Sequence, residues 1–443
     1  MNKFLLINSP IFWDTTNEDE NYLSPLGLAY IATYLERSGF EVTIKDCVKD
    51  RISVSNLLEH INSHKYNFVG INIFTPNLHI VKHIIENIDS SCEIFIGGQI
   101  VKSLYSEITS FNTTNKCHII IGEGEFIVPA IAKGNYNEIP LKVEGNMTVY
   151  EVNKNSKYFP EDISGIILNR KFLPNEITIN HYGKKEASII ASRGCAYNCA
   201  FCGGARSLNQ NISIRTRTPE SILDEIRELI SIYPDLQSVR ILDDLFLRNY
   251  SSIESAKEIF NKLPELHWRG MIHALSIEKH TDKLNILSNA NCDELFMGIE
   301  SGSDRIRNKI NKLGTIETVL ETASAILKNG IDLKGYFILG FPEENKDDFE
   351  DTFSLACKLK EISQKSEGNF RASVFQFRPY HGTQLYNEIQ EQGIVIPDCT
   401  LNEEISVFDG RTQFNFTSGN YSLERDDTLN DYIVKIQSLN NGE

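Results

Sequence analysis

The chain has 443 residues, of which 41% are hydrophobic and 23% are charged, and its formal net charge is −16. This length and composition predict a globular protein of two or three domains. The acidic balance argues against a nucleic-acid partner, because such binding depends on Lys and Arg contacts with phosphates. Arg215 and Arg217 form a small basic patch, which is interpreted as solvated surface. No apolar run approaches the roughly 18 residues of a membrane span, and the N-terminus does not resemble a signal peptide.

The first 135 residues alternate short apolar runs with amphipathic stretches, the pattern of a doubly wound, Rossmann-like parallel sheet. Strands are predicted at Lys3–Ile7, Glu41–Lys45, Phe68–Ile73, Glu93–Ile96 and His118–Ile121. Such sheets bind ligands at the carboxyl ends of their strands, so the loops there form the predicted rim. These loops contain Asn8–Pro10, Thr75–Asn77, Gly97–Gln99 and Gly122–Glu125.

A second βα series follows a connecting segment. Residues 136–185 lose the periodicity and are predicted to connect two domains with a few strands, one of them at Gly165–Leu168. Strands are then predicted near Ser188, Val239, Trp268, Glu294, Leu333 and Ser373, each followed by a helical pattern. Six βα units over residues 186–395 predict an open, partial (βα)6 TIM-like barrel. Beyond Gly393 the chain becomes polar, and residues 396–443 are predicted to form an irregular C-terminal segment.

Three cysteines, Cys195, Cys199 and Cys202, form a CxxxCxxC pattern just past the predicted strand Glu186–Ala191. Three thiolates can hold three irons of a cubane cluster and leave the fourth iron open, whereas a structural metal site takes four protein ligands. Active sites of α/β barrels lie at this end of the strands. Two other interpretations are buried apolar cysteines and a zinc site completed by a distant residue. The small, polar surroundings of the thiols favour the cluster.

The cysteine loop, with Phe201 before its last cysteine, resembles that of the radical S-adenosylmethionine enzymes. Later motifs resemble theirs in the same order, at Ile241–Asp244, Gly298–Gly302, Phe337–Glu344 and Phe377–Thr383. The resemblance implies a catalytic [4Fe-4S] cluster on the three cysteines that cleaves S-adenosylmethionine to a 5′-deoxyadenosyl radical. It also implies contacts with S-adenosylmethionine from Phe201, Gly203, Asp243, Glu300, Ser301, Ile338, Gly340 and Pro379. Glu300 is alternatively a structural ion pair, and Asp243 and Asp244 are alternatively helix caps.

Residues 1–135 resemble the cobalamin-binding domain of the subgroup that joins both cofactors. The matching pieces are the helix start Ser24–Leu28 and the turns Gly97–Gly98 and Gly122–Glu125. The resemblance implies cobalamin contacts at Thr75, Pro76, Gly97, Gly98, Gly122 and Glu123. The loop over residues 8–16 has no histidine where methionine-synthase-type domains carry a cobalt ligand, which indicates cobalt without a protein histidine. His79 is the nearest substitute. A sheet that has lost its cobalamin is the alternative.

The resemblance predicts a radical enzyme that methylates an unactivated carbon of a small metabolite or natural-product intermediate. An external donor such as flavodoxin or ferredoxin would supply the electron. Alternatives are cyclisation, oxidation or rearrangement without methyl transfer, a tRNA methylthiotransferase, and an iron–sulfur redox sensor. Cys47, Cys92 and Cys117 fall on or beside separate predicted strands, against the extra cluster that a methylthiotransferase needs. Arg193, Tyr197, Tyr380 and His381 are rim candidates without assigned roles. Nine cysteines without a disulfide framework predict a reducing, cytoplasmic location.

Overall fold

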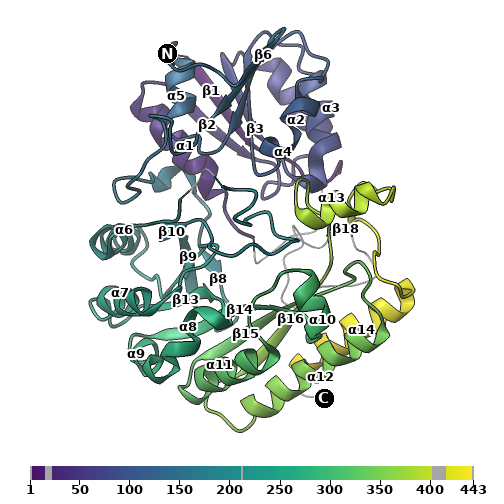
Figure 1. The fold of residues 1–443 in the computed structure, drawn as a ribbon. Coiled ribbons are helices and arrows are strands. Elements are labelled where there is room, and N and C mark those ends of the chain that lie inside the picture. The colour runs from purple at the N-terminus through teal and green to yellow at the C-terminus, as the bar shows by residue number, and fades with distance from the viewer. Residues whose placement is uncertain (1, 15–21, 211–212, 402–415, 442–443) are drawn as a thin grey trace.

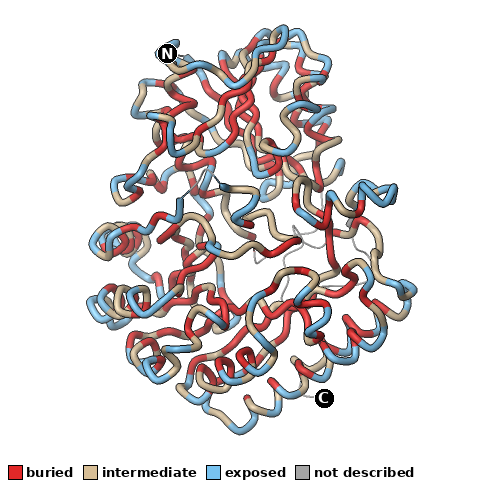
Figure 2. The backbone as a smooth tube through the Cα atoms, viewed as in Figure 1, coloured by how far each residue is buried: buried red, intermediate tan, exposed pale blue. Residues whose placement is uncertain are grey.

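The computed structural model describes residues 2–14, 22–210, 213–401 and 416–441 of the chain. Two sheets, each flanked by helices, form the two halves of the molecule (Figure 1). The carboxyl ends of strands from both sheets line one cleft between the halves. Buried residues concentrate along the strands and on the inner sides of the helices (Figure 2). The architecture therefore brings two predicted ligand-binding rims together.

The first sheet has the strand order β2-β1-β3-β4-β5-β7-β6, and all neighbours except β6 and β7 run parallel. Its strands are β1 Lys3–Asn8, β2 Glu41–Asp46, β3 Phe68–Asn72, β4 Glu93–Gly97, β5 Lys116–Ile121, β6 Lys142–Glu144 and β7 Met147–Glu151. Helices α1 Leu26–Arg37 and α5 Ile127–Ala132 pack on one face. Helices α2 Val54–Ser63, α3 Leu78–Glu86 and α4 Val101–Ile108 pack on the other. The strand order reverses between β1 and β3, which is where open α/β sheets bind their ligands.

The segment predicted to connect the domains contributes to this first sheet. Strand β7 pairs with β5 in parallel, and β6 closes the sheet as an antiparallel edge. The strand predicted at Gly165–Leu168 is wrong, because these residues form no ladder. Ile166 and Leu168 instead pack against Leu26 and Tyr30 of α1. A short apolar run can bury its side chains against a helix without entering a sheet, and periodicity alone does not separate the two cases.

The second sheet is the predicted open barrel, with the order β16-β15-β14-β13-β12-β9-β8. Its strands are β8 Thr178–Ile179, β9 Lys185–Ile189, β12 Ser238–Ile241, β13 His267–Ile272, β14 Cys292–Glu300, β15 Asp332–Leu339 and β16 Phe370–Gln376. The helices are α6 Pro219–Ile232, α7 Tyr250–Phe260, α8 Ala274–Ile277, α9 Asn285–Ser288, α10 Asp304–Lys309, α11 Ile316–Lys328, α12 Lys346–Ser363 and α13 Gln384–Glu391. Six strands from β9 to β16 run parallel, and β8 is an antiparallel edge. The prediction of a partial barrel is confirmed.

The prediction of an irregular C-terminus is wrong for its last part. Helix α14, Asp426–Ser438, packs through Leu429, Tyr432 and Ile433 into the core beneath the barrel sheet. These residues follow the i, i+3, i+4 spacing of an amphipathic helix, so the sequence does carry a helix pattern here, although the segment is polar overall. Beyond the helix, the side-chain amide of Asn440 bonds both backbone groups of Ala372 at 2.8 Å. The C-terminus thereby covers the exposed edge of β16.

Side chains alternate between the two faces of the barrel sheet. On β14, Leu295, Met297 and Ile299 face the outer helices and join one large apolar core. Glu294 and Phe296 point to the concave side. Glu294 accepts hydrogen bonds from Arg371 at 2.8 Å and Arg269 at 3.1 Å. Glu186 of β9 accepts from the same Arg269 at 2.8 Å. Buried ion pairs therefore join four strands at the amino end of the barrel.

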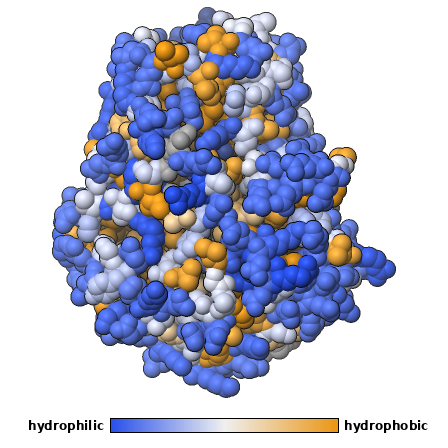
Figure 3. Space-filling view, viewed as in Figure 1, coloured by the Kyte–Doolittle hydropathy of each residue, from blue (hydrophilic) through white to orange (hydrophobic). Residues whose placement is uncertain are grey.

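The outer surface is largely polar. The face shown in Figure 3 is mostly hydrophilic, with apolar side chains in several separate groups. Within the described ranges, no helix combines the length and the apolar character that crossing a membrane requires.

Replacing Glu294 by glutamine tests the buried ion-pair network. Burial alone raises the pKa of Glu294, but Arg371 and Arg269 outweigh it and lower the pKa from 4.5 to about 2. The carboxylate therefore stabilises the fold above pH 4.5, and its contribution is lost as the pH falls toward 2. We expect E294Q to lower the free energy of unfolding at pH 7 by about 3–5 kcal/mol, because Arg371 loses the carboxylate that it pairs with and Arg269 keeps only Glu186.

Urea unfolding at pH 7 and at pH 4 measures this effect. E228Q, at an exposed position of α6, is the control and should change stability by less than about 0.5 kcal/mol. Equal midpoints for E294Q and the natural protein would contradict a stabilising role of the network.

Candidate functional site

A cavity of about 720 Å³ lies between the two sheets. On the side of the first sheet it is lined by the loops that follow β1, β3, β4 and β5 and by the start of α1. On the barrel side it is lined by Ile190 and Arg193 after β9 and by Leu242 and Asp244 after β12. The cavity therefore lies at the switch point of the first sheet and at the carboxyl rim of the barrel, the positions expected for ligands in both folds.

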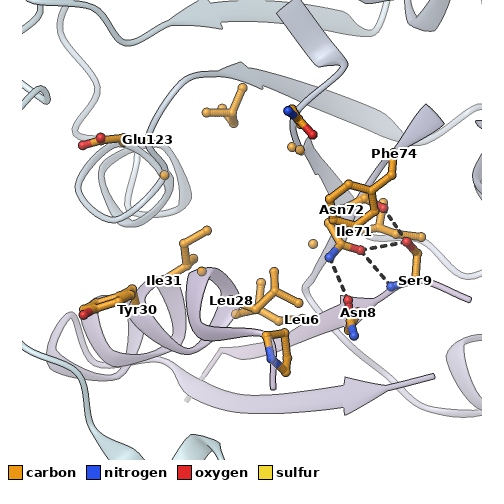
Figure 4. A pocket seen from close by; sticks show the side chains of 18 of the residues that line it. Leu6, Asn8, Ser9, Leu28, Tyr30, Ile31, Ile71, Asn72, Phe74 and Glu123 are labelled. Atoms are coloured by element: carbon orange, nitrogen blue, oxygen red, sulfur yellow. Dashed lines mark hydrogen bonds between the residues drawn. The ribbon is translucent and has the colours of Figure 1, made fainter. Parts of the chain in front are cut away.

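The part of the cavity inside the first domain is an apolar slot between the sheet and α1 (Figure 4). Leu6, Leu28 and Ile31 line it. Two glycines keep the slot open: a Cβ on Gly70 would lie 2.6 Å from Leu6 Cδ2, and one on Gly124 would lie 2.8 Å from Ile31 Cδ1. A slot of this kind accepts an apolar or aromatic portion of a large ligand.

Polar side chains fix the rim above this slot. Asn72 donates from Nδ2 to Asn8 Oδ1 at 2.9 Å and accepts from the Ser9 backbone N–H at 2.8 Å (Figure 4). Asn77 donates to Ser9 Oγ at 2.7 Å. These bonds join the loops after β1 and β3, the two strands that flank the switch point. Gly98 lies beside them with φ +126°, and a Cβ there would be 2.3 Å from the Ile73 carbonyl oxygen. Only glycine fits this turn.

All residues predicted to contact cobalamin line the cavity. They are Thr75, Pro76, Gly97, Gly98, Gly122 and Glu123. His79 does not line it: its ring packs against Trp13 at 5.8 Å, and its Nδ1 is 3.9 Å from Asp398. Residues 15 and 16 of the histidine-free loop lie outside the described residues. Among the described residues, no histidine lines the cavity.

The cysteine loop begins directly after β9. Short strands β10 Ser192–Arg193 and β11 Arg215–Thr216 pair antiparallel and bracket it. Asp243 accepts hydrogen bonds from the Ala191 backbone N–H at 2.8 Å and from Ser192 Oγ at 2.6 Å. Burial raises the pKa of Asp243 to about 6. The Asp243 side chain thus anchors the start of the cysteine loop.

The thiols lie at the rim of the barrel with partial access. Cys195 and Cys202 are half-buried, and Cys199 is 8% exposed. Burial raises the pKa of all three thiols, that of Cys202 to about 12, so binding of iron would displace protons from them. In the described ranges, no three His, Cys, Asp or Glu side chains gather around a single metal position. A cubane cluster binds each thiolate at a separate iron, which suits thiols spread along one loop.

A buried ion-pair network joins the cysteine loop to the first domain. Arg193, two residues before Cys195, contacts Glu125 at 2.7 Å and Glu123 at 3.0 Å. Arg215, on the far side of the loop, also pairs with Glu123. Arg215 and Arg217 are 6% and 7% exposed, so their interpretation as solvated surface is wrong. The sequence did not reveal the partners of Arg193 and Arg215, because 68 to 92 positions separate these arginines from their carboxylates.

Residues predicted to contact S-adenosylmethionine surround the cysteine loop. Phe201 packs on Phe341 with ring centroids 5.6 Å apart, and Ile338 joins the same apolar cluster beside Ala200. Gly340 donates its N–H to Glu344 at 2.6 Å. Pro379 is buried, and Gly203 lines a second cavity of about 250 Å³ beside Gln99.

The fourth-strand motif is held by internal contacts. Glu300, with φ +66°, pairs with Lys312 at 3.0 Å. Ser301 is fully buried, and its hydroxyl contacts Thr352 Oγ1 at 3.2 Å and accepts from the Ser303 backbone N–H at 3.1 Å. The Ser301 hydroxyl is therefore engaged within the fold. Lys312 carried no signal in the sequence, because a lysine twelve residues beyond the strand motif resembles any surface lysine.

Fold and site together define a two-domain α/β protein, in which a Rossmann-type ligand cleft faces a half-barrel rim with three thiols. The B12 binding domain family matches residues 14–132, and the Radical SAM superfamily matches residues 189–356. The chain therefore combines a B12 binding domain with a radical S-adenosylmethionine domain and is an enzyme.

Individual relatives agree with this assignment. An uncharacterised methyltransferase of Pyrococcus horikoshii is 26% identical over 82% of this chain and 77% of its own. The cytidylyl-2-hydroxyethylphosphonate methyltransferase of Streptomyces wedmorensis is 23% identical over 85% of this chain and 80% of its own. The fold resembles that of the radical S-adenosylmethionine methyltransferase TsrM from Kitasatospora setae, with TM-score 0.63 and 17% identity over 92% of this chain and 80% of that one.

The two domains imply three groups: cobalamin in the first domain, and a [4Fe-4S] cluster with S-adenosylmethionine in the barrel. The observed residues fit them. Side chains at Gly70 and Gly124 would collide with Leu6 and Ile31 of the slot, so their absence suits a bulky corrinoid. Three thiols on one rim loop fit a cluster with an open iron.

Replacing Cys199 by alanine removes one of three thiol ligands without disturbing the apolar core. We expect the anaerobically reconstituted C199A protein to lose most of its iron and sulfide and its visible absorption, and to keep its far-UV circular dichroism. C357A, at a half-buried position of α12, should retain the full cluster. A C199A protein with as much iron as C357A would show that Cys199 is not a ligand.

Replacing Gly124 by valine fills the apolar slot from its wall. The position has no left-handed backbone, and a Cβ there meets the side chains of Ile31 at 2.8 Å and Val128 at 3.4 Å rather than backbone. We expect at least about tenfold weaker binding of hydroxocobalamin, a loss of about 1.4 kcal/mol, in equilibrium dialysis. G165V, where a Cβ meets nothing within 4 Å, is the control. Equal affinities of the two variants would place the corrinoid elsewhere.

Proposed function

We propose that this enzyme transfers a methyl group to an unactivated carbon of a small metabolite or natural-product intermediate in a cobalamin-dependent radical reaction. One observation carries the proposal: a single cavity is lined by the cobalamin-type loops and by the rim of the barrel. Glycines 97, 98 and 122 line it from one side, and Arg193 and Asp244, which flank the cysteine loop, line it from the other. A methyl donor and a substrate radical must meet in such a shared space.

The chain's own residues would bind and orient the cofactors and the substrate, and they would exclude water from the site. When bound, the cluster and S-adenosylmethionine supply a 5′-deoxyadenosyl radical, and cobalamin supplies a methyl carrier. In this proposal Cys195, Cys199 and Cys202 hold the cluster. Glu300, which pairs with Lys312, orients the amino or ribose groups of S-adenosylmethionine at the strand end. Phe201 and Ile338 shield this region from water.

The remaining predicted contacts divide between the two cofactors. We assign Gly203, Asp243, Ser301, Gly340 and Pro379 to S-adenosylmethionine; of these, Asp243 and Ser301 act through the loops that their side chains hold. We assign the six cobalamin-type residues that line the cavity to the corrinoid. Cobalt then has no histidine from the described part of the chain.

The proposed functional units follow the chain. Residues 1–135 bind cobalamin, residues 136–185 connect the domains and extend the first sheet, residues 186–395 generate the radical, and residues 396–443 form the C-terminal segment. The substrate is a small molecule, and an external flavodoxin or ferredoxin donates the electron. Cys47, Cys92 and Cys117 are buried in the core of the first sheet, which supports this over a methylthiotransferase with a second cluster.

Product analysis tests the proposal. The anaerobic protein, reconstituted with iron, sulfide and hydroxocobalamin, is given S-adenosylmethionine, reduced flavodoxin and candidate substrates. We expect both S-adenosylhomocysteine and 5′-deoxyadenosine, because methyl transfer and radical formation each consume one S-adenosylmethionine. C199A serves as the inactive control.

Each other product pattern has a definite meaning. Formation of 5′-deoxyadenosine alone would indicate a radical reaction without methyl transfer, such as a cyclisation or oxidation. Absence of both products under strong reductant would contradict the proposed activity and favour a redox sensor.

A further inference from the structure

The concave face of the barrel carries charged side chains of both signs. Strand alternation places Arg240 and Ser238 of β12 on this face, because Val239 and Ile241 belong to the outer core. Along the other strands, too, every second residue faces the concave side. Among the strands β9 to β16, the charged residues of this face are Glu186, Arg240, Arg269, Glu294, Glu300, Asp332, Lys334 and Arg371. Four cations thus face four carboxylates.

All four carboxylates are engaged by residues other than Arg240. Glu300 pairs with Lys312 at 3.0 Å, and Asp332 accepts from the Tyr182 hydroxyl at 2.7 Å. Glu186 accepts from Arg269, and Glu294 accepts from Arg269 and Arg371. Among the described residues, no carboxylate forms an ion pair with Arg240. The concave face therefore presents one guanidinium that its own carboxylates leave uncompensated.

The surroundings of Arg240 make an unpaired guanidinium at this position unfavourable for the stability of the fold. Its Nε is buried and has no hydrogen-bond partner within the described ranges, and its guanidinium lies over the Phe296 ring, 4.8 Å from the centroid. In the sheet register Arg240 stands directly beside Arg269, and like charges at paired positions destabilise a sheet. Ser373, on the same face, has a buried hydroxyl that also lacks a partner there. An unmade hydrogen bond of a buried donor costs stability.

Arg240 lies where a ligand that enters through the cavity can reach it. Leu242, two residues later on the same side of the strand, lines the barrel side of the cavity. Two strand residues span about 7 Å, so Arg240 lies one layer below the cavity wall. Its side chain is half-buried, which leaves part of the guanidinium accessible.

We propose that Arg240 binds an anionic group of the substrate, a carboxylate or a phosphoryl group, at the bottom of the barrel. This rests on the proposed function and adds the chemical class of the substrate. A guanidinium forms two parallel hydrogen bonds with such a group, and the Phe296 ring holds its plane. The anchored anion leaves the rest of a small substrate near the cysteine loop at the rim.

Thermal unfolding of the full chain, with and without orthophosphate or acetate at constant ionic strength, tests the proposal. We expect R240M to be at least as stable as the natural protein without anions, because it removes the contact with Arg269 and an unpaired donor. We expect one of the two anions to raise the Tm of the natural protein and to bind R240M at least tenfold more weakly. The anion that acts identifies the group as phosphoryl or carboxylate.

Two further variants separate recognition from structure. R240K keeps the charge but loses the planar fork, so it should recover only part of the anion response. R227M, at an exposed position of α6 paired only with Asp224, should respond like the natural protein. A lower Tm of anion-free R240M, an undiminished anion response of R240M, or no response of the natural protein to either anion would overturn the assignment.

The anion-binding test of Arg240 and the test of the proposed activity can fail separately. Formation of 5′-deoxyadenosine by the natural protein tests radical chemistry without reference to Arg240. If the protein cleaves S-adenosylmethionine but R240M responds to anions as the natural protein does, only the anion site fails. If anions bind through Arg240 but no cleavage occurs, only the proposed function fails.

Discussion

The buried ion pairs between Arg193 and Arg215 on one side and Glu123 and Glu125 on the other hold the two domains in register. Burial raises the pKa of Glu123, but Arg215 and Arg193 outweigh it and lower the pKa below its ordinary value. Removing one member of such a pair leaves a buried charge, which typically costs about 3–5 kcal/mol. Because Arg193 stands two residues before Cys195, the position of the cysteine loop depends on a loop of the other domain. The network thus helps to hold together the loops that line the shared cavity.

The two walls of that cavity differ in chemistry. The first domain offers an apolar slot kept open by missing side chains at Gly70 and Gly124. The barrel offers thiols at its rim and, further down, Arg240, which forms no ion pair with a carboxylate among the described residues. A large, neutral or apolar cofactor suits the first wall, whereas a small anionic substrate suits the second. This division lets two ligands share one space without competing for the same contacts.

Local sequence patterns predicted the strands and the cysteine loop well, since both depend on neighbours along the chain. The alternation around Leu295 and Met297 and the spacing of Cys195, Cys199 and Cys202 need no distant partner to be recognised. The errors have one physical origin. Arg215 was interpreted as solvated because its partner Glu123 is remote in sequence, and Arg217 because the fold, not the spacing, buries its pair with Glu225. Gly165–Leu168 was interpreted as a strand because its burial against α1 imitates the signal of a sheet.

The sequence by itself determined the class of fold, the spacing of the three cysteines and the glycines of the cobalamin-type rim, because these are properties of residue type and spacing. Only the tertiary structure decided which charges are compensated. Arg269 and Arg371 find Glu186 and Glu294 across the barrel, and Arg240, an arginine of the same kind on the same face, does not. Pairing between strands far apart in the chain, set by the register of the whole sheet, makes that difference.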